Sequence, residues 1–415
     1  MRRTGVRASG AERPALTAFL GVFTATLLCF LAIGAVLPIL PRYVTDELGA
    51  GNLAVGVVIG AFAISALIGR PIGGRLADRH GRKTIHAIGL AICAVAGLLL
   101  FLPFGVAGLI FARLVVGLGD GWVFTAGVTW IVDLSPEERR GQSIGMFGLS
   151  IWGGLTFGAV IGEGMYALGG YGAVWAFAAL APLAGLLVGR FVPEAPPTPQ
   201  PVEEELAAAE LGTALGPQAP RAAAGSPWIP REAVRPGVAL ALANVGYGTM
   251  AGFVVLLLDE RGIGHGAAAF TVFSASVVAA RLGLGRLPDM LGPRRTALGA
   301  GIVQGLGLIA VGAAQSLPAA LAAAALMGAG MSLLFPSLAL LVVDRVDPAR
   351  RGAAMGAFTA FFDLGVGLGA PFAGLVASWS GEYPPAFYVG GALCLMGAVL
   401  GWFSTRGIRQ GPVPA

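Results

Sequence analysis

The sequence predicts an all-α polytopic membrane protein with twelve transmembrane helices in two pseudo-symmetric six-helix halves. Three observations lead to this fold class. Hydrophobic residues are 56% of the 415 residues and charged residues only 12%, whereas a soluble domain carries about 25% charged residues. Twelve apolar runs are each long enough for the roughly 20 residues that a membrane-spanning helix needs. Finally, the two parts of the chain repeat one another at a constant offset of 211 residues.

The apolar runs are far too long for barrel strands, so each is expected to be a helix. The expected spans are 17–41, 52–72, 84–104, 106–132, 142–166, 172–192, 236–258, 266–286, 296–316, 318–343, 352–378 and 384–405. Between the sixth and seventh spans the composition changes to a polar segment rich in Pro, Ala and Glu. The expected organisation is therefore an N-terminal bundle over 1–192, a linker over 193–234 and a C-terminal bundle over 235–415.

The distribution of basic residues predicts the orientation. Of the 27 lysines and arginines, only Arg42 and Arg261 fall between spans on one side, and Arg113 lies within a span. Because cytoplasmic loops carry the excess of lysine and arginine, both termini are expected in the cytoplasm, with the chain in the cell (inner or plasma) membrane. This placement also accounts for the net charge of +5 without a nucleic-acid partner.

Soluble chemistry is not expected. The three cysteines all lie in apolar runs, and no spacing of histidines and cysteines suggests a metal site. Glycine-rich stretches lie inside spans, so neither a nucleotide site nor an enzyme motif is indicated. The sequence therefore predicts no catalytic residues, no metal and no cofactor, and we expect a monomer.

The internal repeat covers several loops and spans. The segment Gly74-Arg75-Leu76-Ala77-Asp78 recurs as Gly285-Arg286-Leu287-Pro288-Asp289. The other matched positions are Arg70 with Arg281, Gly81 with Gly292, Asp133 with Asp344, Gly145 with Gly356, Gly154 with Gly365, and Gly158 with Gly369. Parallel repeats of this kind place the substrate between the two halves, near the middle of the bilayer.

The segment Gly74 to Lys83, which follows the second span, resembles the loop signature G-x-L-x-D-[RK]-x-G-[RK]-[RK] of the major facilitator superfamily. The chain departs from the signature at His80, where the family usually has an aromatic residue. In the second copy, Met290 replaces the first basic residue and Pro293 precedes Arg294. The resemblance covers nearly the whole chain and implies transport by alternating access.

The resemblance implies a conformational latch at these loops. Asp78 would sit at the positive N-terminus of span eleven, and Arg82 would pair with Asp133 at the end of span four. The expected latch residues are Gly74, Asp78, Arg79, Gly81, Arg82, Lys83, Asp133, Asp289, Arg294 and Asp344. A simpler interpretation is that the basic residues only set the orientation and the glycines only form a turn.

Charged residues inside the spans are candidates for proton coupling, because a charge in the bilayer is costly and by default functional. Arg113 and Asp120 lie two helical turns apart on one face of span four. Arg113 and the glycines after it resemble a motif of proton-coupled family members. Asp363, in span eleven, is the third candidate. The alternative is a structural role, with Arg113 and Asp120 tethering spans of the N-terminal half.

Span five carries Gly145, Gly154, Gly158 and Gly162, which match four positions of the G-x8-G-x3-G-P-x2-G-G pattern of the family's drug exporters. Ala159 stands where that pattern has proline. These glycines are expected to allow close helix packing. Polar and aromatic candidates for the substrate cavity are Trp122, Trp152, Asn244, Tyr247 and Gln304.

We therefore expect a secondary transporter, resembling the twelve-span drug:proton antiporters, that exports a small, partly apolar compound in exchange for protons. Two alternatives stay open. One is a proton symporter that takes up a sugar, an organic acid or another metabolite. The other is a membrane sensor on the same fold that transports nothing.

Overall fold

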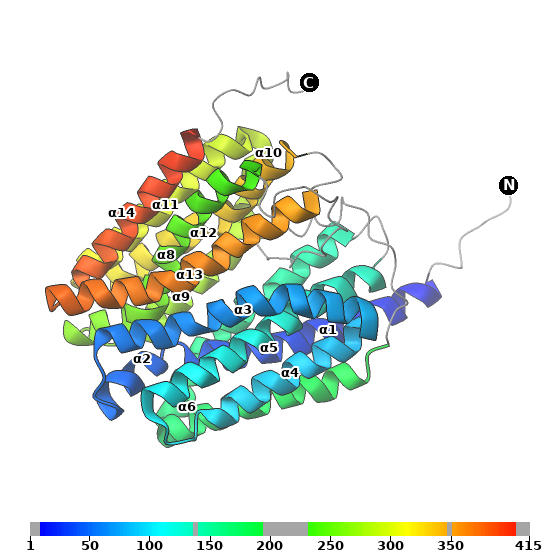
Figure 1. The fold of residues 1–415 in the computed structure, drawn as a ribbon, viewed down its shortest axis with the longest axis horizontal. Coiled ribbons are helices and arrows are strands. Elements are labelled where there is room, and N and C mark those ends of the chain that lie inside the picture. The colour runs from blue at the N-terminus through cyan, green and yellow to red at the C-terminus, as the bar shows by residue number, and fades with distance from the viewer. Residues whose placement is uncertain (1–8, 136–139, 194–230, 347–350, 404–415) are drawn as a thin grey trace.

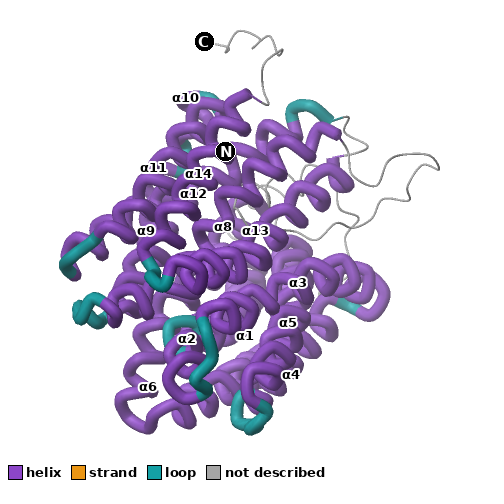
Figure 2. Tube along the Cα trace, turned by 60° about the vertical axis from the view of Figure 1, so that its left-hand side comes forward, coloured by secondary structure: helices purple, strands orange, loops and turns teal. Residues whose placement is uncertain are grey.

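The computed structural model describes residues 9–135, 140–193, 231–346 and 351–403. Within these residues every regular element is helical (Figure 2). The N-terminal half contains α1 (Ser9–Val36), α2 (Leu40–Arg42), the π-helix η1 (Tyr43–Glu47), α3 (Asn52–His80), α4 (Arg82–Leu99), α5 (Gly105–Leu134) and α6 (Arg140–Arg190). The C-terminal half contains α8 (Arg231–Glu260), α9 (Gly266–Leu284), α10 (Leu287–Leu291), α11 (Pro293–Ala313), α12 (Leu317–Val343), α13 (Arg351–Ser380) and α14 (Pro384–Phe403).

Among the described residues, 11 helices are long and apolar enough to cross a membrane. One of them, α6, accounts for two of the expected spans. Its 51 residues would measure about 76 Å as a straight helix, far more than the roughly 30 Å of a bilayer core. The backbone leaves helical geometry at Gly169 and Gly170, where Gly170 has φ 60°. The twelve-span fold class is therefore confirmed, with spans five and six joined by a two-glycine reversal.

The two halves form separate groups of helices (Figure 1). The helices from α1 to α6 make one group, and those from α8 to α14 make the other. Successive spans alternate in direction, so α3 ends and α11 begins at the same end of the bundle. This end, marked by His80 and Pro293, is called the motif end below. The other end, where α2 and Asp259 lie, is called the opposite end.

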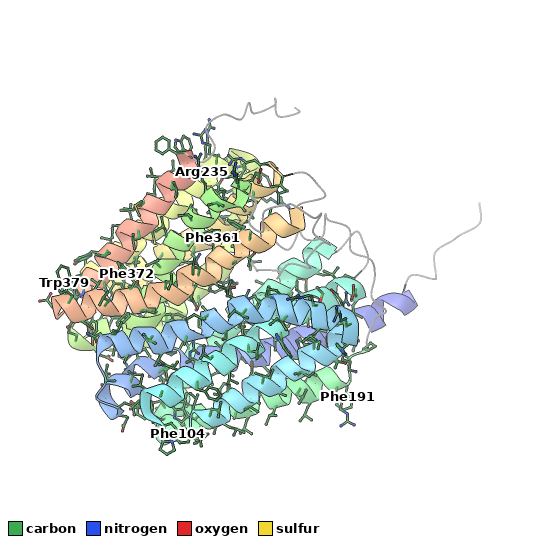
Figure 3. All side chains as sticks on the ribbon, in the orientation of Figure 1. Phe104, Phe191, Arg235, Phe361, Phe372 and Trp379 are labelled. Carbon is green, nitrogen blue, oxygen red and sulfur yellow. The ribbon has the colours of Figure 1, made fainter. Side chains whose placement is uncertain are left out.

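The outer surface is apolar. Phe104, Phe191 and Trp379 point away from the bundle (Figure 3), and Phe191 and Trp379 are 84% and 90% exposed. Water would not favour such a surface, but lipid chains cover it without cost. Buried side chains from both halves form one large apolar cluster, in which Phe30, Phe147, Phe253 and Phe273 are almost wholly enclosed, and a second cluster lies within the C-terminal half.

Helix packing follows the repeat predicted from the sequence. A Cβ at Gly117 would collide with the Phe62 carbonyl, and a Cβ at the equivalent Gly328 would collide with the carbonyl of Phe273. Phe62 and Phe273 are themselves 211 positions apart. The two copies of the loop glycine also share one backbone geometry, with φ 93° and ψ 145° at Gly81 and φ 82° and ψ 146° at Gly292.

The segment that we expected as a loop between spans two and three is mostly helical. Helix α3 continues to His80, and only Gly81 separates it from α4. The positive φ of Gly81 is open to glycine at little cost, so a single residue reverses the chain. In the second copy, Pro293 follows Gly292 at the first position of α11, which suits its fixed φ.

Candidate functional site

Three charged side chains from three helices meet inside the bundle. The Arg70 guanidinium on α3 lies 3.3 Å from the Asp363 carboxylate on α13 and 3.7 Å from the Asp120 carboxylate on α5. Their side chains are between 4% and 11% exposed. Asp363 belongs to the C-terminal half and the other two residues to the N-terminal half. Arg70 therefore joins the halves through an ionic bridge, called the central bridge below.

The surroundings of Arg70 fix its position. Its guanidinium lies 5.2 Å from the centre of the Phe124 ring, within the range of a cation–π interaction. Gly121 lets the arginine stem approach α5, since a Cβ there would lie 3.1 Å from Arg70 Cγ. One cation thus faces two carboxylates in a nearly dry environment, where charged groups interact strongly.

Arg113 forms no ion pair with Asp120 among the described residues. That Arg113 acts on Asp120 across two helical turns of one helix face stays a prediction. Seven residues separate them by about 10 Å along the helix. Arg113 stacks instead over the Phe62 ring at 5.0 Å, and its Nε and Nη2 atoms are buried without a hydrogen-bond partner.

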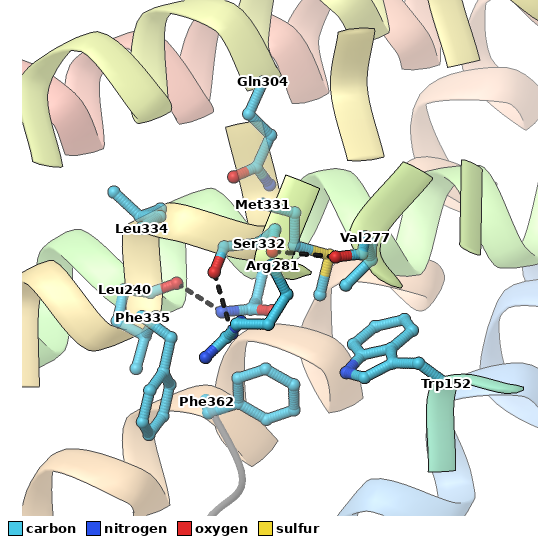
Figure 4. Close-up of a pocket in the computed structure, with 11 residues that line it drawn as sticks. Trp152, Leu240, Val277, Arg281, Gln304, Met331, Ser332, Leu334, Phe335 and Phe362 are labelled. Carbon is cyan, nitrogen blue, oxygen red and sulfur yellow. Dashed lines mark hydrogen bonds between the residues drawn. The ribbon is translucent and has the colours of Figure 1, made fainter. Parts of the chain in front are cut away.

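A small pocket with a cavity volume of about 10 Å³ lies mostly in the C-terminal half, where Phe362, the neighbour of Asp363, is one of its lining residues. Trp152 of α6 contributes one wall from the N-terminal half (Figure 4). The other lining residues are Leu240, Asn244, Val277, Arg281, Gln304, Met331, Ser332, Leu334, Phe335 and Phe362. Trp152, Asn244 and Gln304, which we predicted for the cavity, thus line one pocket.

Hydrogen bonds hold the polar side chains of this pocket in place. Arg281 Nη2 donates to the Ser332 carbonyl at 2.8 Å (Figure 4). The Asn244 amide donates to the Leu240 carbonyl at 2.9 Å, and the Gln304 amide donates to the Ala243 carbonyl at 2.8 Å. The amide oxygens of Asn244 and Gln304 are buried and have no hydrogen-bond partner among the described residues.

The remaining cavity candidates, Tyr247 and Trp122, differ in position. Tyr247 is buried against Trp152 and Phe273, with ring centres 6.3 and 5.9 Å away, so it lies where the halves meet. Trp122 instead packs between α5 and α3, and its indole donates to the Gly69 carbonyl at 3.1 Å. Trp122 therefore belongs to the packing of the N-terminal half.

At the motif end, the first copy of the loop forms a connected set of ion pairs. Arg82 lies 3.1 Å from Asp78 and 3.1 Å from Asp133. Lys83 donates to the carbonyls of Arg190 and Val192 at 2.8 and 2.7 Å, which fixes α4 to the end of α6. Gly74 lies close to α5, and Arg79 is exposed.

The second copy of the loop lacks this arrangement, because Pro293 stands at the position equivalent to Arg82. Arg294 stacks on the Trp402 ring at 3.9 Å instead. Asp289 is exposed in α10, and Asp344 follows the end of α12. The residues just before α13, where we expect Asp78 to sit, lie outside the described part of the chain.

At the opposite end, Arg42 joins the halves a second time. It pairs with Glu163 of α6 at 3.0 Å and with Asp259 of α8 at 2.7 Å, and a second hydrogen bond to Asp259 measures 3.2 Å. The Tyr383 hydroxyl, from the C-terminal half, donates to the Asn52 side chain at 3.2 Å. We call the Arg42, Glu163 and Asp259 group the outer clamp.

The glycines of span five lie against α1. A Cβ at Gly154, Gly158 or Gly162 would press against the α1 backbone, while Gly145 lies nearer the start of α6. Close glycine contacts also join the halves near the opposite end, where Gly56 and Gly60 of α3 meet α13. Toward the motif end, α3 and α13 diverge (Figure 1).

Sequence patterns alone did not indicate three of these features. Arg70, at the end of the expected span 52–72, counts only as one more basic residue on the majority side, although its match to Arg281 in the repeat indicates a shared role. Arg42 was counted only as a basic residue on the minority side. Glu163 matches no position of the motifs in span five. Each of these contacts depends on the packing of distant spans, which a single sequence does not specify.

Comparisons with known proteins bear on the fold and the family. The family model of the Major Facilitator Superfamily matches residues 22–303 and 237–414. An uncharacterized MFS-type transporter of Salmonella typhimurium is 32% identical over 389 residues, which are 91% of this chain and 94% of that protein. An uncharacterized MFS-type transporter of Burkholderia pseudomallei is 32% identical over 388 residues, or 91% of this chain and 90% of the relative.

Solved structures agree in fold at low sequence identity. The nucleoside transporter NupG superposes with a TM-score of 0.73 at 14% identity, covering 94% of this chain and 100% of that one. The peptide-transporter-family protein PepTSo gives a TM-score of 0.71 at 14% identity, covering 94% and 97%. The human organic anion transporter MFSD10 gives 0.66 at 19% identity, covering 94% and 99%.

Proposed function

Because the chain belongs to the Major Facilitator Superfamily of membrane transporters, we propose that it exports a small, partly apolar compound in exchange for protons. The proposal places the protein in the cell membrane with both termini in the cytoplasm. Transport then runs by alternating access, as the two halves rock about the pocket between them.

The central bridge carries this proposal. Two carboxylates, Asp120 and Asp363, share one guanidinium in a buried position. Two carboxylates that share a single cation carry one negative charge more than the cation neutralises, so one of the pair is the natural site for a proton. Charged residues at membrane depth mark proton and substrate pathways, and these three lie where the halves must move.

The bridge also suggests how a proton changes the equilibrium between the arrangement open at the motif end and the arrangement open at the opposite end. When Asp120 carries a proton, Arg70 interacts chiefly with Asp363, and the tie between the halves is strong. When the proton leaves, the Asp120 carboxylate draws the guanidinium toward α5 and weakens that tie. Proton occupancy thereby shifts the relative free energies of the two arrangements, which is what coupling requires.

The latch at the motif end would act on the same equilibrium. The Asp78, Arg82 and Asp133 group is preassembled on the N-terminal half. We propose that it meets the C-terminal half when the motif end closes. In the present arrangement the outer clamp holds the opposite end, so the two sets of ion pairs would alternate.

Export is favoured by the glycines of span five, whose spacing matches four positions of the drug-exporter pattern. Uptake with protons uses the same central bridge, so direction requires a measurement. The direction of transport is measured in everted membrane vesicles whose lumen is acidified by respiration. A pH-sensitive dye follows the pH of that lumen. A library of small neutral, anionic and cationic compounds is added from outside.

An exporter that exchanges protons releases protons from the vesicle lumen as its substrate enters, and vesicles with Asp120→Asn protein do not. A library compound that is accumulated with no proton release, or release that persists in Asp120→Asn, would contradict proton exchange. Vesicles without the transporter serve as the control for passive leak.

A further inference from the structure

The pocket contains an arginine that is the repeat equivalent of Arg70. Arg281 lies 211 positions after it, and the surrounding packing is equivalent as well. Phe124, which stacks with Arg70, corresponds to Phe335, which lines the pocket with Arg281. The close contact of Gly119 with Cys93 corresponds to that of Gly330 with Gln304. The two arginines therefore occupy matching places in the two halves.

The acids of the central bridge have no acidic counterparts in the second site. Asp120 corresponds to Met331, and Asp363 corresponds to Trp152. Both of these residues line the pocket beside Arg281. Where Arg70 has two carboxylates as neighbours, the equivalent positions beside Arg281 carry the thioether of Met331 and the indole of Trp152. Among the described residues, the pocket lining contains one cation and no acidic side chain.

The pocket lies at the depth expected for a substrate site. Val277, which lines the pocket, is 11 residues from the outer start of α9 at Gly266, or about 16 Å along the helix, and Arg281 lies about one turn further toward the motif end. Trp152 comes from the other half, so a molecule in the pocket touches both halves. A ligand that contacts both moving parts can favour one arrangement over the other.

We propose that this pocket binds the carboxylate of a small organic anion with an apolar or aromatic body, with Arg281 as the residue that recognises the carboxylate. This inference rests on the proposed transport function and names the class of its substrate. A guanidinium matches the planar geometry of a carboxylate and donates two parallel hydrogen bonds to it. The Ser332 carbonyl holds the guanidinium in place at 2.8 Å.

The remaining lining residues select the rest of the ligand. Trp152, Phe335 and Phe362 offer aromatic surfaces, which suit an apolar or aromatic body. The buried oxygens of Asn244 and Gln304 accept hydrogen bonds from a hydroxyl or amine group on that body, since a buried polar atom left unpaired is costly. A hydroxylated aromatic carboxylate combines all three features.

Equilibrium binding to the purified full-length transporter in detergent tests this inference. The probes are 4-hydroxybenzoate and 3-phenylpropanoate, each compared with its neutral amide, by isothermal titration calorimetry at neutral pH. The native protein is expected to bind at least one carboxylate roughly tenfold or more tightly than its amide, a difference of about 1.4 kcal/mol. Equal binding of acid and amide, or no binding of either carboxylate, would overturn the inference.

Two variants test whether Arg281 causes the preference for the carboxylate over the amide. Arg281→Gln is expected to lose the preference for the carboxylate while binding the amide as before. Met331→Asp, which places the acid of the first site into the second, is expected to lose carboxylate binding because the new side chain occupies the guanidinium. Arg286→Gln, an exposed arginine five residues away, is the matched control and should bind as the native protein does.

An unchanged carboxylate preference in Met331→Asp would overturn the assignment, and this holds even where Arg281→Gln does not fold. Because binding is measured without a membrane or a gradient, a failure of proton coupling leaves the contrast between acid and amide intact. Conversely, equal binding of acid and amide would overturn the substrate class without changing the result expected for proton release in the vesicles.

Discussion

At the scale of single residues, the most informative feature is a pair of equivalent arginines with opposite surroundings. Arg70 is bridged to two acids, whereas Arg281 lies in a pocket lined by Met331 and Trp152. The repeat in the sequence was sufficient to match the two arginines. It was not sufficient to place Asp363 beside Arg70, because that contact crosses between the halves.

The central bridge predicts a specific pattern of stability. Removing one partner of a buried ion pair leaves the other charge uncompensated, at a cost of about 3–5 kcal/mol. Arg70→Gln is therefore expected to lower the melting temperature of the detergent-purified protein markedly. Adding Asp363→Asn to Arg70→Gln should restore part of the loss, because the second change removes a stranded carboxylate.

Thermal melting of the two single variants and the double variant shows whether their effects on the melting temperature are additive. The exposed Arg75 provides the control, as Arg75→Gln should melt like the native protein. Additive effects of Arg70→Gln and Asp363→Asn would show that the two side chains do not interact in the membrane protein.

At the scale of helices, apolar runs were sufficient to locate the spans, but their ends depended on turn geometry. Helix α3 runs eight residues past the expected end at residue 72, because the loop motif is itself helical up to the glycine at 81. Spans five and six join through Gly169 and Gly170. Helix packing partners, such as α3 with α13, could not be predicted, since glycines are too common in this chain to indicate particular contacts.

The outer clamp makes a prediction about how these helices separate. Asp259→Asn removes one of the two acids that hold Arg42. Because both acids are about one-third exposed, the loss should be modest, at about 1 kcal/mol or less. In a Tyr383→Cys background, we expect Asp259→Asn to raise the rate of labelling by a membrane-impermeant maleimide from the opposite end severalfold.

Glu260→Gln changes the neighbouring exposed acid and is the matched control for that experiment. The three native cysteines are buried, so they should contribute little labelling. Identical rates for Asp259→Asn and Glu260→Gln would mean that the clamp does not hold the opposite end closed.

At the scale of the whole molecule, the composition, the twelve apolar runs and the repeat were enough to predict the fold, because a bilayer admits few ways to satisfy the backbone. The repeat predicts a substrate site between the halves, and the pocket, which lies mostly in the C-terminal half, takes one wall, Trp152, from the N-terminal half. The chemistry of the pocket did not follow from the repeat, since the identity of the residues that face one another across the halves emerges only from the packed structure.

Orientation is a prediction about the whole molecule that arises from the basic residues. Single cysteines introduced in the segment 194–230 are expected to react with an impermeant maleimide in everted vesicles and to stay unlabelled in intact cells. The physical reason is that positively charged loops stay in the cytoplasm. Labelling of these cysteines in intact cells would reverse the assigned orientation, and a cysteine beside Arg42 supplies the opposite control.

The central claim is that protons drive transport through the acids that share Arg70, and the Asp120→Asn variant in proteoliposomes tests it most directly. Asparagine mimics the protonated acid permanently, so the variant has no proton to exchange at this position. Substrate exchange between equal pools requires alternating access but no net proton movement. We predict that Asp120→Asn protein loses accumulation driven by a pH gradient while keeping this exchange. Uphill transport by Asp120→Asn, with the pH dependence of the native protein, would contradict the claim.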